Sequence, residues 1–143
     1  MTASPRAWHR STEYPAGFPD ASWKEGEAGF GTKVSAFAPI RTPWKTDEIW
    51  IRRSFSWPKD GQGDLFVEID HDDDAEVWIN GILAVTCPLY SYGGYFSLPV
   101  SAEAQASLRP GPNVIAVHCK NAKTVQYLDV GLVRILPMKP PGK

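Results

Sequence analysis

Alternation of apolar and polar residues marks the most regular parts of this chain. Residues 65–70 read LFVEID and residues 75–79 read AEVWI, and both place apolar side chains at every second position. Because the side chains of a strand point alternately to its two faces, each segment predicts a β-strand with one face in a core. Residues 49–55, IWIRRSF, are rich in β-branched and aromatic side chains and predict a third strand.

Turn signals separate these strands from several others. Asn80-Gly81 is the preferred pair of a two-residue type I′ hairpin, so residues 82–86 are expected to return antiparallel to residues 75–79. Residues 101–111 predict a helical turn that Pro110-Gly111 closes. The remaining predicted strands are residues 95–100, 113–120 and 126–136.

Seven or eight short strands without intervening helices predict an all-β fold, an antiparallel two-sheet β-sandwich of the jelly-roll type. Twelve Gly and thirteen Pro residues support this prediction, because they interrupt long helices and suit turns between short strands. We expect one domain over residues 1–136, in which residues 1–46 wrap the sandwich and contribute one short strand near Thr32–Ala38. Residues 137–143 are expected to be a tail or linker.

Strand parity predicts which loops lie together. If successive strands alternate in direction, four loops meet at one end of the sandwich: the loop before residues 49–55 and the loops after residues 65–70, 82–86 and 113–120. Six Trp, five Tyr and six Phe exceed what a core of this size needs, so some aromatic rings are expected at the surface. Aromatic and acidic residues gather in these four loops, and a binding site is expected there.

Charge and composition exclude several classes of partner. The 15 Lys and Arg against 16 Asp and Glu give a formal net charge of −1, so no basic field exists to bind nucleic acid or an anionic membrane. No apolar run approaches the roughly 20 residues that span a bilayer, and the first ten residues lack the pattern of a signal peptide. Cys87 and Cys119 lack metal-site spacing and are expected to be buried thiols, although a bridge between them stays open.

The densest polar cluster follows the strand at residues 65–70 and consists of Asp70, Asp72, Asp73, Asp74 and Glu76. Its alternating oxygens resemble a calcium loop, but the sixth position is not Gly and the twelfth is Gly81 instead of Glu, which excludes an EF-hand. Three interpretations stay open: a looser structural calcium site, a turn whose Asp side chains cap backbone N–H groups, and carboxylates that bind ligand hydroxyls.

Five motifs occur in an order that resembles a known family: DASWKEGEAGFGT, TDEIWIRRSFSWP, HDDDAEVWINGILA, YSYGGYFSLPVS and LRPGPNVIAVHCKN. They resemble galactose-binding-like jelly rolls, in particular the sugar-binding domain of family-two glycoside hydrolases and related accessory carbohydrate-binding modules. The resemblance covers roughly residues 20–133. It implies the sandwich fold, a polysaccharide or oligosaccharide ligand, the catalytic domain of a parent glycoside hydrolase as a partner, and an extracellular or periplasmic location within a larger secreted protein.

The resemblance implies a sugar site at the four-loop end. Sugars pack their C–H faces on aromatic rings and need planar polar groups for their hydroxyls. The expected platform is Trp44, Tyr90 and Tyr92, and the expected hydrogen-bonding residues are His71, Asp72, Asp74 and Asn121. Trp50 and Trp78 lie within strands, where they face the second sheet, a parent-enzyme interface or solvent.

The predicted function is a non-catalytic carbohydrate-binding module of a secreted polysaccharide-degrading enzyme. Adjacent carboxylates on one exposed turn do not supply the separated pair that glycoside hydrolysis needs, so no catalytic residue, metal ligand or cofactor is assigned. The alternative is a structural domain that packs against a glycoside hydrolase catalytic domain and has no sugar affinity of its own.

Overall fold

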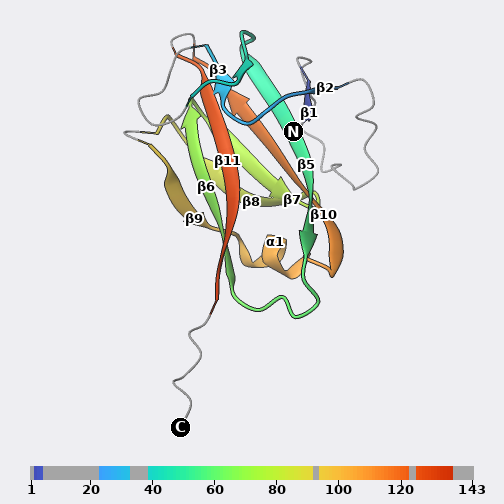
Figure 1. Cartoon of the computed structure of the whole chain (residues 1–143). Coiled ribbons are helices and arrows are strands. Elements are labelled where there is room, and N and C mark those ends of the chain that lie inside the picture. Colours follow the sequence, from blue (N-terminus) through green and yellow to red (C-terminus); the bar gives the residue numbers. More distant parts are fainter. Residues whose placement is uncertain (1, 5–22, 33–38, 92–93, 123–124, 137–143) are drawn as a thin grey trace.

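Two β-sheets packed face to face make up the described part of the chain, which comprises residues 2–4, 23–32, 39–91, 94–122 and 125–136 of the computed structural model (Figure 1). In the order of its neighbouring strands, sheet A contains β2 (Lys24–Glu25), β1 (Thr2–Ser4), β5 (Glu48–Trp57), β10 (Gly111–Lys120), β7 (Ala75–Ile79) and β8 (Ile82–Cys87). Sheet B contains β4 (Thr42–Pro43), β3 (Phe30–Gly31), β11 (Tyr127–Ile135), β6 (Asp64–Asp72) and β9 (Phe96–Pro99).

The predicted two-sheet β-sandwich is confirmed. Each of the seven longer strands, β5 to β11, covers a segment that the sequence predicts. From β5 to β6, from β6 to β7, and again from β8 through β11, the chain passes from one sheet to the other, so each sheet combines strands that are distant in sequence. This crossing pattern is that of a jelly roll.

The prediction for the N-terminal segment is wrong in its strand content. Within the described residues before β5 there are four very short strands, β1 to β4, instead of one. Thr32 follows β3 without belonging to a strand, and residues 33–38 lie outside the described residues. The pair β3 and β4 is parallel, with Phe30 beside Thr42 and Gly31 beside Pro43. Strands of two residues show no alternation, so no periodicity could predict them.

The core lies between the sheets and follows the predicted alternation. In β7, Ala75, Val77 and Ile79 are buried, whereas Glu76 and Trp78 between them are less buried. Burying an aliphatic side chain of this size stabilises the fold by about 1.5–3 kcal/mol. The largest fully buried apolar side chains are Phe30, Ile51, Val67, Ile69, Val77, Ile79, Val117 and Leu128.

The predicted hairpin at Asn80-Gly81 is confirmed. Asn80 has φ 50° and Gly81 has φ 85°, as a turn with two left-handed residues requires. Asn80 also connects elements: its side-chain amide donates to the Ser107 carbonyl at 2.9 Å and to the Asn113 Oδ1 at 2.8 Å, and its Oδ1 accepts from the Val114 N–H at 3.0 Å.

The predicted helical turn is the short helix α1 (Ala102–Ala106). The Ser101 hydroxyl caps its first turn by accepting from the Ala104 N–H at 3.2 Å, and Ala104 is buried in the core. No helix within the described residues has the length and apolar character needed to cross a membrane.

Asn113 is the buried polar residue that connects the segments at the end of the sandwich near α1. It is fully buried and makes four hydrogen bonds, two with Arg109 and one each with Gly111 and Asn80. We expect Asn113→Ala to lower the free energy of unfolding by about 2–4 kcal/mol, because it leaves buried donors and acceptors unpaired. Urea denaturation measures this, and the exposed Ser97→Ala control should change stability by less than about 0.5 kcal/mol. Equal stability of the two variants would contradict this role.

Candidate functional site

The four loops that strand parity brings together do meet at one end of the sandwich, the upper end in Figure 1. Backbone hydrogen bonds connect them directly. The Ser91 N–H donates to the His71 carbonyl, the Asp73 N–H to the Lys120 carbonyl, and the Asn121 N–H to the Asp47 carbonyl, at 2.7–2.8 Å. The loop before β5 and the loops after β6, β8 and β10 therefore form one connected surface, which we call the loop end.

Trp44 does not lie on this surface, so the expectation of an exposed Trp44 ring is wrong. Its side chain is only 3% exposed and belongs to the core cluster. The Trp44 N–H donates to the Gly31 carbonyl at 3.0 Å, and the indole N–H donates to the Thr46 hydroxyl at 3.0 Å. Pro43 pairs with Gly31 of β3, and the Trp44 ring packs into the core.

The carboxylates of the acidic turn, residues 70–76, form hydrogen bonds with the neighbouring loops. The Asp74 carboxylate accepts the Leu89 N–H at 2.6 Å, and the Asp73 carboxylate accepts the Ala122 N–H. The expectation that His71 offers its ring to a ligand is wrong: the ring is buried, and its Nδ1 lies 2.5 Å from the Asp73 carbonyl. Of the three interpretations of this turn, the structure contains the one in which Asp side chains cap backbone N–H groups.

Asp72 is the ionisable residue of the turn with the most altered environment. Burial raises the pKa of its carboxyl to about 6, and a hydrogen bond with Asp73 and the negative charges of Asp73 and Asp70 act in the same direction. Its backbone forms a bridge with Tyr90, whose side chain is 42% exposed. Asp72 and Tyr90 are thus the two predicted site residues that the structure places side by side.

Two further predicted site residues are Asn121 and Tyr92. Asn121 is half-buried at the loop end, where its N–H donates to the Asp47 carbonyl. Tyr92 lies outside the described residues.

A second polar group continues from the loop end across the outer face of sheet B. We call Asp70, Asp72, Tyr95, Tyr127 and Asp129 the sheet B face. Asp70 pairs with Asp129, and Asp72 with Tyr127, between β6 and β11. Tyr95 immediately precedes β9, whose Phe96 pairs with Ile69, so Tyr95 stands beside Asp70. Its hydroxyl reaches across to donate to the Asp129 carboxylate at 2.6 Å.

The sheet B face combines a half-exposed ring with acceptors of strong hydrogen bonds. Tyr95 is 43% exposed, and its pKa is raised by burial of the hydroxyl and then by the hydrogen bond to Asp129. Burial and the charge of Asp129 also raise the pKa of Tyr127, whose own hydroxyl is buried beside Tyr95 without a well-formed hydrogen bond. A side chain at Gly131, two residues after Asp129 on β11, would meet no atom within 4 Å, so the surface is open next to Asp129.

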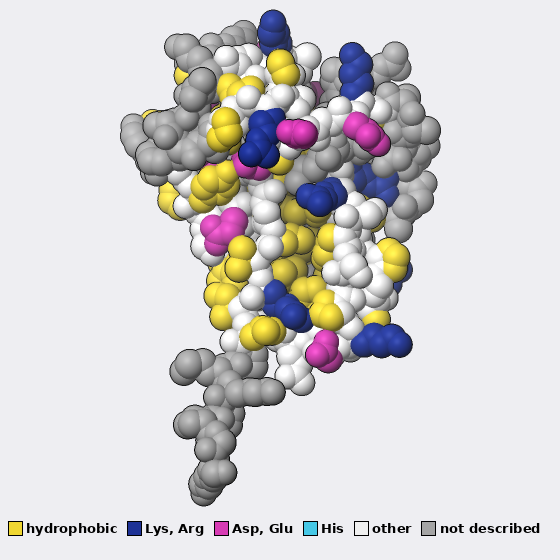
Figure 2. All heavy atoms as spheres, in the orientation of Figure 1, with side chains coloured by type: hydrophobic (Ala, Val, Ile, Leu, Met, Phe, Trp, Pro, Cys, Tyr) yellow, Lys and Arg dark blue, Asp and Glu magenta, His cyan; other side chains and the backbone are white. Residues whose placement is uncertain are grey.

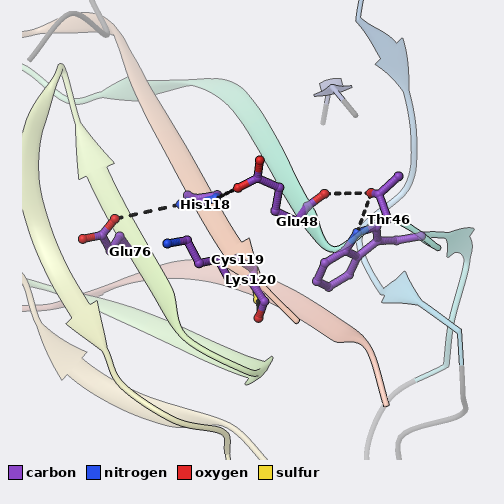
Figure 3. Close-up of polar contacts among 7 residues, drawn as sticks. Thr46, Glu48, Glu76, His118, Cys119 and Lys120 are labelled. Atoms are coloured by element: carbon purple, nitrogen blue, oxygen red, sulfur yellow. Dashed lines mark hydrogen bonds and ion pairs between the residues drawn. The ribbon is translucent and has the colours of Figure 1, made fainter. Parts of the chain in front are cut away.

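The outer face of sheet A carries a different cluster, made of Trp50, Trp78, His118, Glu48 and Glu76. The Trp50 ring stacks on His118 at a centroid distance of 4.1 Å and on Trp78 at 5.5 Å. Figure 3 shows His118 between Glu48 and Glu76: its Nε2 lies 2.8 Å from one carboxylate and its Nδ1 4.0 Å from the other. Trp50, His118 and Glu76 are neighbours in register on β5, β10 and β7.

The sequence patterns of the separate strands indicate the members of both clusters but not their assembly. Alternation in β7 and β10 places Trp78 and His118 on the face opposite to the core, but the stacking requires the order of β5, β10 and β7 in sheet A. Likewise, Asp129 lies in a predicted strand, yet only the pairing of β11 with β6 brings it to Tyr95.

Both cysteines are free and buried. They flank Ala75 on either side, because β7 pairs with β8 through Cys87 and with β10 through Cys119. Burial raises the pKa of the Cys87 thiol to about 11 and also raises that of Cys119. The expectation of buried thiols is confirmed. In the described part of the chain, no group of three or more His, Cys, Asp or Glu side chains is arranged to hold a metal ion.

No protein-family model and no curated protein matches the chain, whereas several solved structures share its fold. A family 2 glycosyl hydrolase from Bacteroides cellulosilyticus aligns with a TM-score of 0.57 and 16% identity, over 93% of this chain and 20% of that chain. A beta-glycosidase from Bacteroides vulgatus aligns with a TM-score of 0.56 and 16% identity, over 93% and 19%. A beta-glucuronidase from glycoside hydrolase family 2 aligns with a TM-score of 0.51 and 19% identity, over 86% and 13%.

These similarities confirm the expected resemblance at the level of the fold. The fold of the sandwich is similar to that of a segment of each of these enzymes, and the chain spans about a fifth or less of their length.

His118 makes the stability of the fold depend on pH. Burial is the largest influence and lowers its pKa below the ordinary 6.5; the charge of Lys120 acts in the same direction, whereas Glu48 and Glu76 oppose it. Below pH 6.5 the unfolded chain therefore binds a proton that the folded chain resists, so stability falls as the pH falls. We expect His118→Gln to remove this contribution, so that the stability of the native protein relative to the variant falls between pH 7 and pH 5.

Urea denaturation of the native protein and the His118→Gln variant at several pH values measures the difference. Other titrating groups, Asp72 among them, are present in both proteins and cancel in it. Parallel stability curves for the two proteins would contradict a lowered pKa for His118.

Proposed function

We propose that the chain is a non-catalytic domain of a glycoside hydrolase and that it binds carbohydrate on the sheet B face. The observation that carries the proposal is the Tyr95 ring, which lies half-exposed across the outer face with its hydroxyl fixed on Asp129. A ring held in this way offers an apolar surface to the C–H face of a sugar and loses little freedom on binding.

The groups around Tyr95 suit the hydroxyls of a sugar. The carboxylates of Asp129 and Asp72 supply hydrogen-bond acceptors. The open surface at Gly131 leaves room for a ligand beside the ring. Tyr90 continues the aromatic surface toward the loop end. The proposed site thus contains Tyr90 and Asp72, which the sequence predicts, and has the Tyr95 ring in place of Trp44.

The fold similarity supports the larger context. The segments that this sandwich matches belong to proteins described as a glycosyl hydrolase, a beta-glycosidase and a beta-glucuronidase. A domain of such an enzyme that holds a polysaccharide raises the effective concentration of substrate near the catalytic domain. An extracellular or periplasmic location within a larger secreted protein belongs to the same proposal.

Removal of the Tyr95 ring tests the proposal. We expect the native chain to be retained on at least one member of a panel of cellulose, xylan, mannan and an array of oligosaccharides. Tyr95→Ala should weaken that binding about tenfold or more, or about 1.4 kcal/mol, and Asp129→Asn should weaken it less. Affinity electrophoresis or calorimetry on the retained glycan measures these differences.

The control is Leu83→Ala, which removes an apolar side chain of similar exposure from β8 in the other sheet. It should bind as the native protein does. Retention by Tyr95→Ala equal to that of the control would reject the sheet B face as the site, and a folded native chain that binds no glycan of the panel would reject carbohydrate binding itself.

A second candidate function is that of a structural domain packed against the catalytic domain of a glycoside hydrolase. It is favoured by the apolar side chains that β11 exposes at its end: Val133, Ile135 and the following Leu136 are 41–55% exposed. Contiguous apolar surface of this kind is typical of an interface.

A further inference from the structure

A groove opens between the two sheets on the face seen in Figure 1. It has a volume of about 390 Å³ and is lined by residues 53–56 of β5, by Ile115 of β10 and by residues 130–132 of β11. Figure 2 shows hydrophobic side chains along a hollow in the middle of this face. The groove runs between the sheets, whereas the proposed carbohydrate site lies over the outside of sheet B; the two meet at Gly131 of β11, which lines the groove and adjoins Asp129.

Both walls of the groove are strand edges without a partner in the described residues. β1 pairs with β5 only at residues 50–52, so the edge of β5 from Arg53 onward is unpaired. β3 pairs with β11 only at Tyr127 and Leu128, so the edge of β11 from Asp129 to Ile135 is unpaired. Unpaired edges present a row of backbone N–H and C=O groups that an additional strand can bind.

The side chains inside the groove follow the strand alternation and give it a defined chemistry. Phe55 from β5 and Leu132 from β11 are the half-buried apolar groups of its two walls, and Ile115 forms its floor. Phe55 and Leu132 each stand two positions from an arginine on the same strand, Arg53 on β5 and Arg134 on β11. The groove therefore has an apolar centre, with Arg53 in its lining and Arg134 beyond Leu132 at its end.

The two arginines are placed to meet a negative charge. Arg134 lies over the Trp57 ring at 5.5 Å and so connects the ends of β11 and β5 at one end of the groove. Arg53 lines the groove itself and is exposed. Neither guanidinium forms an ion pair with a carboxylate of the described residues. A second copy of this chain would bring its own arginines to the same place, so charge disfavours symmetric pairing of two grooves.

We propose that this groove binds an extended segment of a neighbouring polypeptide, with apolar residues at alternate positions and an acidic residue on the same face. The segment pairs with the free edge of β11, which is the longer of the two unpaired edges. Its apolar side chains contact Phe55 and Leu132, and its carboxylates meet Arg53 and Arg134. This inference specifies a surface for the structural candidate above and does not depend on carbohydrate binding.

A synthetic peptide tests the proposal with the full chain. The probe is an acetylated and amidated peptide of sequence Glu-Thr-Val-Thr-Val-Thr-Glu, which puts two Val and two Glu on one face of a strand. Titration followed by NMR reports the affinity, and amide hydrogen exchange reports which backbone groups become protected. We expect saturable binding with protection of amides between Asp129 and Ile135.

Two control peptides separate the contributions of charge and backbone. A peptide with Lys in place of both Glu should bind at least tenfold more weakly, because the arginines repel it. A peptide with Pro at the central position lacks a backbone donor and should also bind at least tenfold more weakly. Equal affinity of the three peptides, or no protection of β11 amides by the Glu peptide at millimolar concentration, would overturn the proposal.

Variants of the chain locate the binding surface. Arg53→Glu and Arg134→Glu, both at exposed side chains, should each weaken binding of the Glu peptide about tenfold and strengthen binding of the Lys peptide. The control Leu83→Asp places a charge on an exposed apolar residue of β8 and should leave the affinity unchanged. Loss of binding in the control but not in the arginine variants would overturn the assignment to this groove.

Sedimentation of the native chain over a range of concentrations tests the competing occupant. A monomer at all concentrations supports a different polypeptide as the partner. A dimer that Arg134→Glu disrupts would overturn the proposal in favour of a second copy of this chain. Because none of these measurements involves a glycan, their failure is distinguishable from failure of the carbohydrate-binding proposal.

Discussion

The pairing of β5 with β10 is the constraint on which the rest of the structure depends. It runs over ten consecutive residue pairs, from Gly111 beside Trp57 to Lys120 beside Glu48. Its inner face supplies Ile51 and Val117 to the core, and its outer face sets Trp50 beside His118. A shift of one residue would exchange these two faces, so a single register fixes the core, the stacked cluster and one wall of the groove together.

Local alternation and turn chemistry were enough to predict the longer strands, because the information lies within each segment. AEVWI, Asn80-Gly81 and NVIAVHCK each became the element that their sequence indicates. Strand parity even predicted which loops would be neighbours. What failed depends on contacts between distant segments: β1 to β4 exist only through their partners, and Trp44 is buried because Pro43 pairs with β3.

The candidate site illustrates the same division. Residue type and loop position predicted that carboxylates and tyrosines would gather near Asp72 and Tyr90, and the structure places those two side by side. Residue type could not distinguish a carboxylate that caps a neighbouring loop from one that faces outward. The carboxylates of Asp73 and Asp74 accept backbone N–H groups, whereas the Asp129 carboxylate on β11 accepts the Tyr95 hydroxyl across the intervening strand β6. That difference follows from sheet order, which no short sequence motif contains.

The two cysteines have a practical consequence. They are the only cysteines of the chain, both are buried between the sheets, and burial raises the pKa of each thiol, so the folded protein offers little thiolate to an alkylating reagent. A cysteine introduced at an exposed position such as Ser97 would therefore react selectively under native conditions. The fold thus accepts a single fluorophore or spin label without removal of its natural cysteines, and reaction of Cys87 or Cys119 would itself report opening of the sandwich.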